Sequence, residues 1–387
     1  MTSPHDLLPR WLVYHDVAAE AAATPNHFNL SQWDDGFTPS GCRGRSGKIV
    51  RDFPRGCPGL FAVVEQAVSE RTANLLYASA VRARVWGVYV HKDELHVHAS
   101  ETSQKVHHDL EREEAEDPDA YRHALARATV EEFLLGNEGN EWITKKDWAR
   151  THGVAVWVIA SDCNDETEYH LDYAEQVRYE TNVIVPPIYG ATVHVSPLRS
   201  SRTDETLVGE RPMGVMEGGD FHVNVTGLDH YATYGYKTRK HDHRLTTDEL
   251  ETRSTHEVGW KRVSYNFRRG ILCDGEFPHF SSRVRTLVPG ASESDLPLKR
   301  VVVGLNLFPS EIGACVAQFP EHSRAFNRYV KLSQAAVKQT ARLSSNTRQD
   351  GGWTLDSVRA NPKQAAFLKL LVRKVREQKD KTATAST

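Results

Sequence analysis

The residues with the clearest chemical potential are His170 and Asp172, which a single leucine separates. Residues two apart on a strand point to the same side, so an imidazole and a carboxylate with this spacing can face one point. A second histidine, His279, follows Pro278 in a later strand-like segment. Three such ligands on one side of a ferrous ion leave adjacent positions open for other molecules. The sequence therefore predicts a metal site formed by His170, Asp172 and His279.

Other histidines compete for these roles. His222, which follows His170 by 52 residues, is the alternative third ligand. Further His-x-Asp matches or paired histidines occur at 91–93, 96–98, 107–109 and 241–243. We interpret 91–93 and 107–109 as solvated or capping residues and 241–243 as a loop. The pair at 96–98 resembles a cupin HxH…E cluster with Glu101, but the spacing to Glu101 is short and no second glycine-flanked half follows, so we expect an exposed hairpin.

The composition is that of a globular protein. The chain has 387 residues, of which 39% are apolar, enough for two ordinary domains or one large domain with insertions. No apolar run reaches the ~20 residues of a membrane-spanning helix, and the N-terminus lacks the basic and apolar regions of a signal peptide. The five cysteines are scattered and form no CxxC pair, which argues against a disulfide framework or a structural zinc site. We therefore expect a cytoplasmic protein without a membrane partner.

The net charge of −3 is unevenly distributed. From residue 310 to the end, 14 Lys and Arg stand against 6 Asp and Glu, which gives +8 and leaves −11 for the first 309 residues. A basic tail can contact a polyanion, although a solvated helix face is the commoner meaning of such a segment. Nucleic acid is therefore an alternative partner that we do not favour over a small molecule.

The predicted metal ligands lie in a region with the pattern of antiparallel β-structure. From about residue 153, short apolar and β-branched runs alternate with turn residues, without helices between them. The predicted strands lie near residues 154–159, 181–187, 191–195, 218–223, 263–267 and 300–308. This pattern is typical of a sandwich or barrel. Outside this region we expect a helix over 60–81, a strand over 85–90, a helix over 117–136, and helices after residue 310.

The order of these motifs resembles the iron(II)- and 2-oxoglutarate-dependent oxygenases, whose core is a double-stranded β-helix, or jelly roll. The resemblance covers residues 153–308. In that family a His-x-Asp ends an early core strand, a glycine pair follows, and a later strand supplies the second histidine. An arginine on the last core strand then binds the far carboxylate of 2-oxoglutarate. The matching residues here are His170, Asp172, Gly218, Gly219, His279 and Arg300.

The resemblance implies an α+β protein in three parts. An N-terminal α/β region at 1–152 would pack on the barrel, residues 153–308 would form the catalytic double-stranded β-helix, and 309–387 would form a basic helical extension. His170, Asp172 and His279 would bind Fe(II), and Arg300 would hold 2-oxoglutarate. With O2, such a dioxygenase would oxidise a C–H bond of a small organic molecule and convert 2-oxoglutarate to succinate.

Departures from the family pattern leave alternatives open. Arg300 follows His279 by 21 residues, a long interval, so Arg283 and Arg285 are rivals for its role. The Arg-x-Ser form is absent, which leaves the partner of the second carboxylate oxygen undefined. We prefer His279 to His222 because the glycine pair normally precedes the strand with the second histidine. The alternative functions are a nucleic-acid-modifying oxygenase of the same fold and a non-catalytic β-sandwich binding protein.

Overall fold

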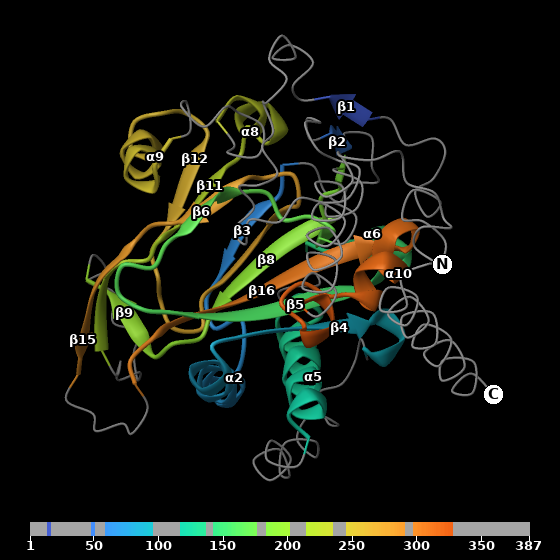
Figure 1. Ribbon diagram of the computed structural model, residues 1–387, viewed down its shortest axis with the longest axis horizontal. Coiled ribbons are helices and arrows are strands. Elements are labelled where there is room, and N and C mark those ends of the chain that lie inside the picture. Colours follow the sequence, from blue (N-terminus) through green and yellow to red (C-terminus); the bar gives the residue numbers. More distant parts are fainter. Residues whose placement is uncertain are drawn as a thin grey trace, which may run out of the picture. The chain divides into compact units, whose positions relative to one another are not determined.

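The computed structural model describes residues 14–16, 48–50, 59–95, 117–136, 142–175, 183–201, 214–234, 245–290 and 297–327 (Figure 1). The chain divides into two compact units, residues 1–331 and 332–387, and all the described residues belong to the first. The histidine segments at 96–98, 107–109 and 241–243 lie outside the described residues, as does most of the basic C-terminal extension.

The largest sheet is six-stranded and antiparallel throughout. Its strand order is β3-β13-β8-β16-β5-β4. The strands are β3 (Phe61–Val64), β13 (Gly270–Asp274), β8 (Tyr189–His194), β16 (Arg300–Pro309), β5 (Thr151–Ser161) and β4 (Val85–His91). Both edge strands, β3 and β4, precede residue 152. The N-terminal region therefore contributes strands to this sheet.

The two faces of this sheet have different roles, which the alternation along β16 reveals. Helices α2 (Glu70–Ala83) and α5 (Pro118–Thr129) share a hydrophobic cluster with every second residue of β16. These β16 residues are Val301, Val303, Leu305 and Leu307. These helices cover the outer face (Figure 1). Successive side chains of a strand point to opposite faces. The other set therefore points to the inner face: Arg300, Val302, Gly304 and Asn306.

The second sheet is four-stranded and packs against the inner face of the first. Its order is β12-β11-β14-β6, again antiparallel. The strands are β12 (Trp260–Val263), β11 (Phe221–Asn224), β14 (His279–Ser281) and β6 (Thr167–His170). Phe221 and Val223 share a hydrophobic cluster with Ile271 and Cys273 of β13. The two sheets thus face each other, and α8 (Leu228–Tyr234) and α9 (Thr247–Ser254) lie beside the four-stranded sheet (Figure 1).

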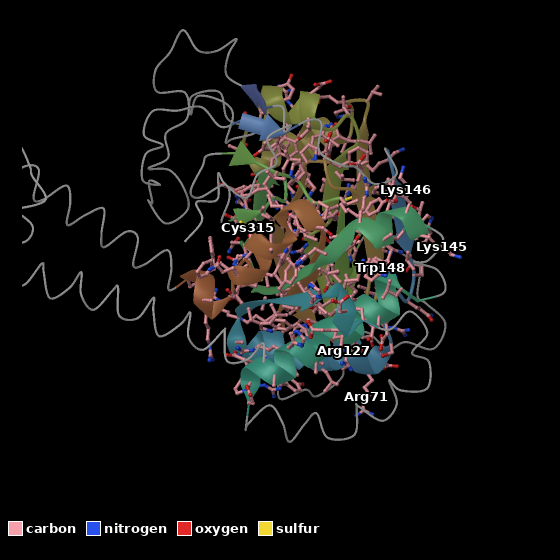
Figure 2. All side chains as sticks on the ribbon, turned by 90° about the vertical axis from the view of Figure 1, so that its right-hand side faces the viewer. Arg71, Arg127, Lys145, Lys146, Trp148 and Cys315 are labelled. Carbon is pink, nitrogen blue, oxygen red and sulfur yellow. The ribbon has the colours of Figure 1, made fainter. Side chains whose placement is uncertain are left out.

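Two smaller sheets and several short helices complete the described elements. One sheet has the order β15-β10-β9, formed by Val284–Pro289, Gly214–Gly218 and Leu198–Ser200. The other has the order β1-β2-β7, formed by Tyr14–Asp16, Lys48–Val50 and Val183–Ile184. The helices are η2 (Lys92–Glu94), η3 (Val130–Leu134), α6 (Lys145–Arg150) and α10 (Ser310–Gln318). The exposed Lys145 and Lys146 project outward from α6 (Figure 2).

The architecture is a mixed α+β fold with antiparallel sheets arranged as a β-sandwich core, which agrees with the strand pattern of the sequence. The expected strand near 85–90 is β4, and the expected helix after Asp117 is α5. A single helix over 60–81 is wrong. Its first part is β3, and α2 begins only at Glu70, where the Ser69 hydroxyl caps it by accepting from the Thr72 N–H. The strand pattern also gave no sign of α8 and α9.

Two general expectations can be compared with the described part of the chain. No helix there is long and apolar enough to cross a membrane. Cys163, Cys273 and Cys315 are free thiols, and Cys42 and Cys57 lie outside the described residues.

Candidate metal centre

Strands β6 and β14 bring the predicted metal ligands together. His170 ends β6, His279 begins β14, and the two are cross-strand partners. Cross-strand partners point to the same face of a sheet, and their ring centroids are 4.5 Å apart. The Asp172 carboxylate, two residues beyond β6, has Oδ1 3.4 Å from His170 Nε2 and Oδ2 3.7 Å from His279 Nε2. All three ligand atoms lie within 4.8 Å of one another.

The backbone fixes the orientation of both imidazoles. His170 Nδ1–H donates to the Glu168 carbonyl at 2.6 Å, and His279 Nδ1–H donates to the Phe277 carbonyl at 3.0 Å. In a neutral imidazole only one nitrogen carries a proton. Each Nε2 therefore presents a lone pair towards Asp172. Metal-binding histidines in proteins are typically held in this way, through a hydrogen bond from the other ring nitrogen.

The pKa values of Asp172 and His279 agree with this assignment of protons. Burial would raise the pKa of Asp172, but the adjacent His279 and His170 outweigh burial and lower it to about 2. Burial lowers the pKa of His279 to about 4, although Asp172 opposes that shift. At neutral pH an ionised carboxylate thus faces a neutral His279, and the centre is a set of electron-pair donors.

This set fits a divalent metal ion. Acceptors that face one another without a proton or a cation between them repel, and a cation at their common point removes that repulsion. Ligands about 2.1 Å from an ion and at right angles lie about 3 Å apart. The 3.4 and 3.7 Å separations, which involve the two different oxygens of Asp172, are close to that value, and all three ligand atoms lie within 4.8 Å of one another. Two histidines and one carboxylate are the ligand type of non-haem Fe(II) oxygenases.

His222, the rival ligand, lies elsewhere. It is the cross-strand partner of Phe280, the residue after His279, so its side chain is on the opposite face of the four-stranded sheet. There the His222 ring stacks on Phe280 with a centroid distance of 4.5 Å, and its Nδ1 bonds the Ser254 hydroxyl at 2.9 Å. The geometry thus groups His279, and not His222, with His170 and Asp172.

Arg300, at the start of β16, is the buried cation of the inner face. Its side chain crosses to the other sheet, where Nη2 donates to Ser281 Oγ at 2.8 Å and Nε donates to the Gly219 carbonyl at 3.1 Å. Only 2% of the residue is exposed. Within the described residues no acid forms an ion pair with it, and nearby Asp220 is paired with Arg262. A buried guanidinium without a counter-ion is costly, so this position fits an anionic ligand.

The glycine pair has a conformational role beside Arg300. Gly218 and Gly219 have φ values of +79° and +69°, which side-chain-bearing residues rarely adopt. A Cβ on Gly218 would lie 1.9 Å from the Arg283 carbonyl, and one on Gly219 would lie 3.0 Å from Arg300 Cδ. The pair therefore lets the chain turn between β10 and β11 while the Gly219 carbonyl reaches the guanidinium.

The two rival arginines are at the surface. Arg283 pairs with Glu166 at 3.0 Å, and Arg285 pairs with Glu251 at 2.8 Å. Their side chains are 41% and 36% exposed. Both therefore have carboxylate partners and access to water, unlike Arg300.

Three residues of this region were not found from the sequence. Asn306 lies on the inner face and donates a hydrogen bond to Asp172, and no described residue bonds its Oδ1. Ser281 holds Arg300, and only its spacing of two residues from His279 could have indicated this. The Trp157 indole lies on Gly304, where an added Cβ would come within 2.0 Å of the ring. Each position depends on strand register, which short motifs do not encode.

Comparisons with known proteins leave the family open. No family model matches the chain, and no curated protein matches it. Similar solved structures include a prolyl-4-hydroxylase from Pseudomonas putida, 10% identical with a TM-score of 0.28 over 64% of this chain and 92% of the other. A prolyl hydroxylase solved with a peptide fragment, from Trichoplax adhaerens, is 8% identical with a TM-score of 0.29 over 67% and 87%. A Phytophthora capsici prolyl 4-hydroxylase is 9% identical with a TM-score of 0.28 over 83% and 90%. With TM-scores this low, the site itself must support any functional assignment.

Proposed function

We propose that the protein is an iron(II)- and 2-oxoglutarate-dependent oxygenase that oxidises a C–H bond of a small organic molecule. One observation carries the proposal. On the inner face between the two sheets, a cluster of three metal-ligand side chains lies near a buried arginine that forms no ion pair with a described acid. The three metal-ligand side chains suit a divalent cation, and the buried arginine suits a carboxylate at a fixed distance from that cation.

The strand order supports a double-stranded β-helix as the scaffold. Going along the chain, β5, β8, β13 and β16 belong to the six-stranded sheet, while β6, β11, β12 and β14 belong to the four-stranded one. The chain therefore crosses repeatedly between two facing antiparallel sheets, as in a jelly roll. We assign this core to residues 153–308, with the ligands at the ends of two adjacent strands of the smaller sheet.

In this proposal the protein contributes binding and orientation. His170, Asp172 and His279 hold the ferrous ion, which supplies the reaction with O2 and the 2-oxo acid when it is bound. Arg300 holds the far carboxylate of 2-oxoglutarate. Ser281, its partner, lies two residues after His279 on the same face, about 7 Å along the strand. A short dicarboxylate can therefore reach from the metal ion to the guanidinium.

The inner face between these two ends is suited to exclude water. The sheet register places Val302 and Gly304 between Arg300 and Asn306, and the Trp157 indole covers Gly304. The proposed metal site is more exposed on one side, because the His170 side chain is 23% exposed and that of His279 is 9% exposed. We propose that the substrate approaches on the His170 side.

The proposal is tested by anaerobic absorption spectroscopy of the full chain with Fe(II) and 2-oxoglutarate. We expect a visible charge-transfer band that requires both additions. The band should be lost in His170→Ala and kept in His222→Ala, which removes a buried histidine from the opposite face. If the unsubstituted protein gives no band and binds no Fe(II), the protein is not such an enzyme, and a non-catalytic β-sandwich becomes the better interpretation.

A further inference from the structure

His194, at the end of β8, is another buried polar side chain on the inner face, and the metal ligands do not account for it. The residue is fully buried, and its Nε2 has no hydrogen-bond partner among the residues that the structure describes. We infer that His194 Nε2–H donates a hydrogen bond to the carboxylate that Arg300 holds, and so makes the protein selective for 2-oxo dicarboxylates. This inference rests on the proposed function and adds a specificity-determining residue to it.

The sheet register places His194 beside Arg300. His194 is the cross-strand partner of Val302, which is two residues from Arg300 on β16. Residues with this relation point to the same face of a sheet. Arg300 is also the leading charged neighbour of the imidazole. The side chains of His194 and Arg300 therefore line the same part of the space between the two sheets.

The proton on Nε2 is fixed by the backbone. The Asn266 N–H donates to His194 Nδ1 at 3.4 Å, so Nδ1 acts as an acceptor. In a neutral imidazole the proton is then on Nε2. Burial lowers the pKa of His194 well below its usual range, and Arg300 and Arg269 lower it further. The ring is thus neutral, with one donor directed away from Asn266.

Tyr265 holds the imidazole in place. Its ring stacks on His194 with a centroid distance of 4.2 Å and an interplanar angle of 10°. The same ring lies 5.6 Å from the Arg300 guanidinium carbon. The Tyr265 hydroxyl is itself fixed, because it donates to the Val301 carbonyl at 2.8 Å and accepts from the Ser196 N–H at 2.9 Å. One anchored ring therefore orients both the cation and the donor.

A fixed N–H donor beside a buried guanidinium selects for an anionic oxygen. A buried donor without a partner destabilises the protein or complex that contains it. A site built around such donors therefore rejects analogues that leave them unpaired. A 2-oxo acid that ends in a methyl group would leave the His194 donor without an acceptor and the Arg300 guanidinium without a counter-ion. A 2-oxo acid that ends in a carboxylate satisfies both.

The test compares two probes of equal chain length, 2-oxoglutarate and 2-oxovalerate, which lacks the far carboxylate. Their affinities are measured by isothermal titration calorimetry on the full chain loaded with Zn(II), so that no turnover is needed. The variants are His194→Phe, which keeps a ring on Tyr265, and Arg300→Gln. The matched control is His222→Phe, which replaces an equally buried histidine stacked on Phe280.

We expect His194→Phe to weaken 2-oxoglutarate binding by about ten- to a hundredfold, the usual range for a hydrogen bond to a charged group. Binding of 2-oxovalerate should not change, and His222→Phe should bind both probes as the unsubstituted protein does. If Arg300→Gln removes the preference for 2-oxoglutarate and His194→Phe retains it, the inference about His194 is overturned while the proposed function stands. If the unsubstituted protein has no such preference, the proposed carboxylate anchor fails, and the inference fails with it.

A second measurement needs no folded variant. In protein labelled with ¹⁵N-histidine, the His194 Nε2–H proton should move downfield when 2-oxoglutarate is added to the Zn(II) form. It should stay in place when 2-oxovalerate is added. If both probes cause the same shift, or if neither causes a shift, water or another group satisfies this donor.

Discussion

Asn306 differs from the three proposed metal ligands because it lies on the other sheet. Its side chain donates to Asp172 from β16, while His170 and His279 belong to β6 and β14. Groups that orient a ligand in this way typically contribute ten- to a hundredfold to metal affinity. We expect Asn306→Ala to weaken Mn(II) or Co(II) binding by about that factor, measured by calorimetry. Asn224→Ala, at a buried residue of β11, serves as the control and should bind the metal normally.

A second single residue, His194, should make the stability of the ligand-free protein depend on pH. Its folded pKa is lowered, so below the unfolded value of about 6.5 the unfolded chain takes up a proton that the folded chain does not. The contribution of the neutral His194 to the free energy of unfolding is therefore fully present above pH 6.5, and it is lost as the pH falls below that value. Relative to the unsubstituted protein, His194→Phe should become more stable as the pH falls from 6.5 to 5. Urea unfolding at both pH values measures this, and a pH-independent difference would contradict a buried neutral imidazole.

At the scale of elements, the packing of Trp157 against β16 requires a glycine. A Cβ on Gly304 would come within 2.0 Å of the indole, whereas a Cβ on Gly190 of the neighbouring strand β8 would have no contact closer than 3.6 Å. We expect Gly304→Ala to destabilise the protein by about 1–3 kcal/mol through overpacking, and Gly190→Ala to have a much smaller effect. Denaturant unfolding measures both. In the double variant Gly304→Ala/Trp157→Ala, the destabilisation caused by the extra methyl group should largely disappear. If the losses of stability of the two single variants simply add in the double variant, the contact with Trp157 is not the cause.

The element scale also explains what the sequence could predict. The clustering of His170, Asp172 and His279 was predictable, because spacing puts the first two on one side of the chain and the Pro-His context marked the third. Their role as metal ligands stays a prediction. Ser281, Asn306 and His194 were not, because each becomes important only through the register between strands far apart in sequence. The sandwich was predictable from alternating short strands. Helices α8 and α9 were not, because they are short and lie between strands whose pattern dominates.

At the scale of the whole molecule, a bound metal ion and a bound dicarboxylate would connect the two sheets. His170 and His279 belong to the four-stranded sheet, whereas Asn306 and Arg300 belong to the six-stranded one. A metal ion together with a dicarboxylate would therefore add contacts that exist only when the sheets are packed together. A ligand that binds only the folded state stabilises it, by about 2.7 kcal/mol at a hundred times its dissociation constant.

We therefore expect the thermal unfolding temperature to rise in two steps, first with Zn(II) and then with 2-oxoglutarate. The second step should require the first, because the 2-oxo end of the cosubstrate is held by the ion and only its far carboxylate is held by Arg300. In His279→Ala both steps should be lost, and in Arg300→Gln only the second should be lost. The surface substitution Arg283→Gln should leave both steps intact, since Arg283 is exposed and pairs with Glu166. Differential scanning calorimetry measures each step. If 2-oxoglutarate stabilises the metal-free protein as strongly as the Zn(II) form, the cosubstrate does not span from the ion to Arg300, and the two sites act independently.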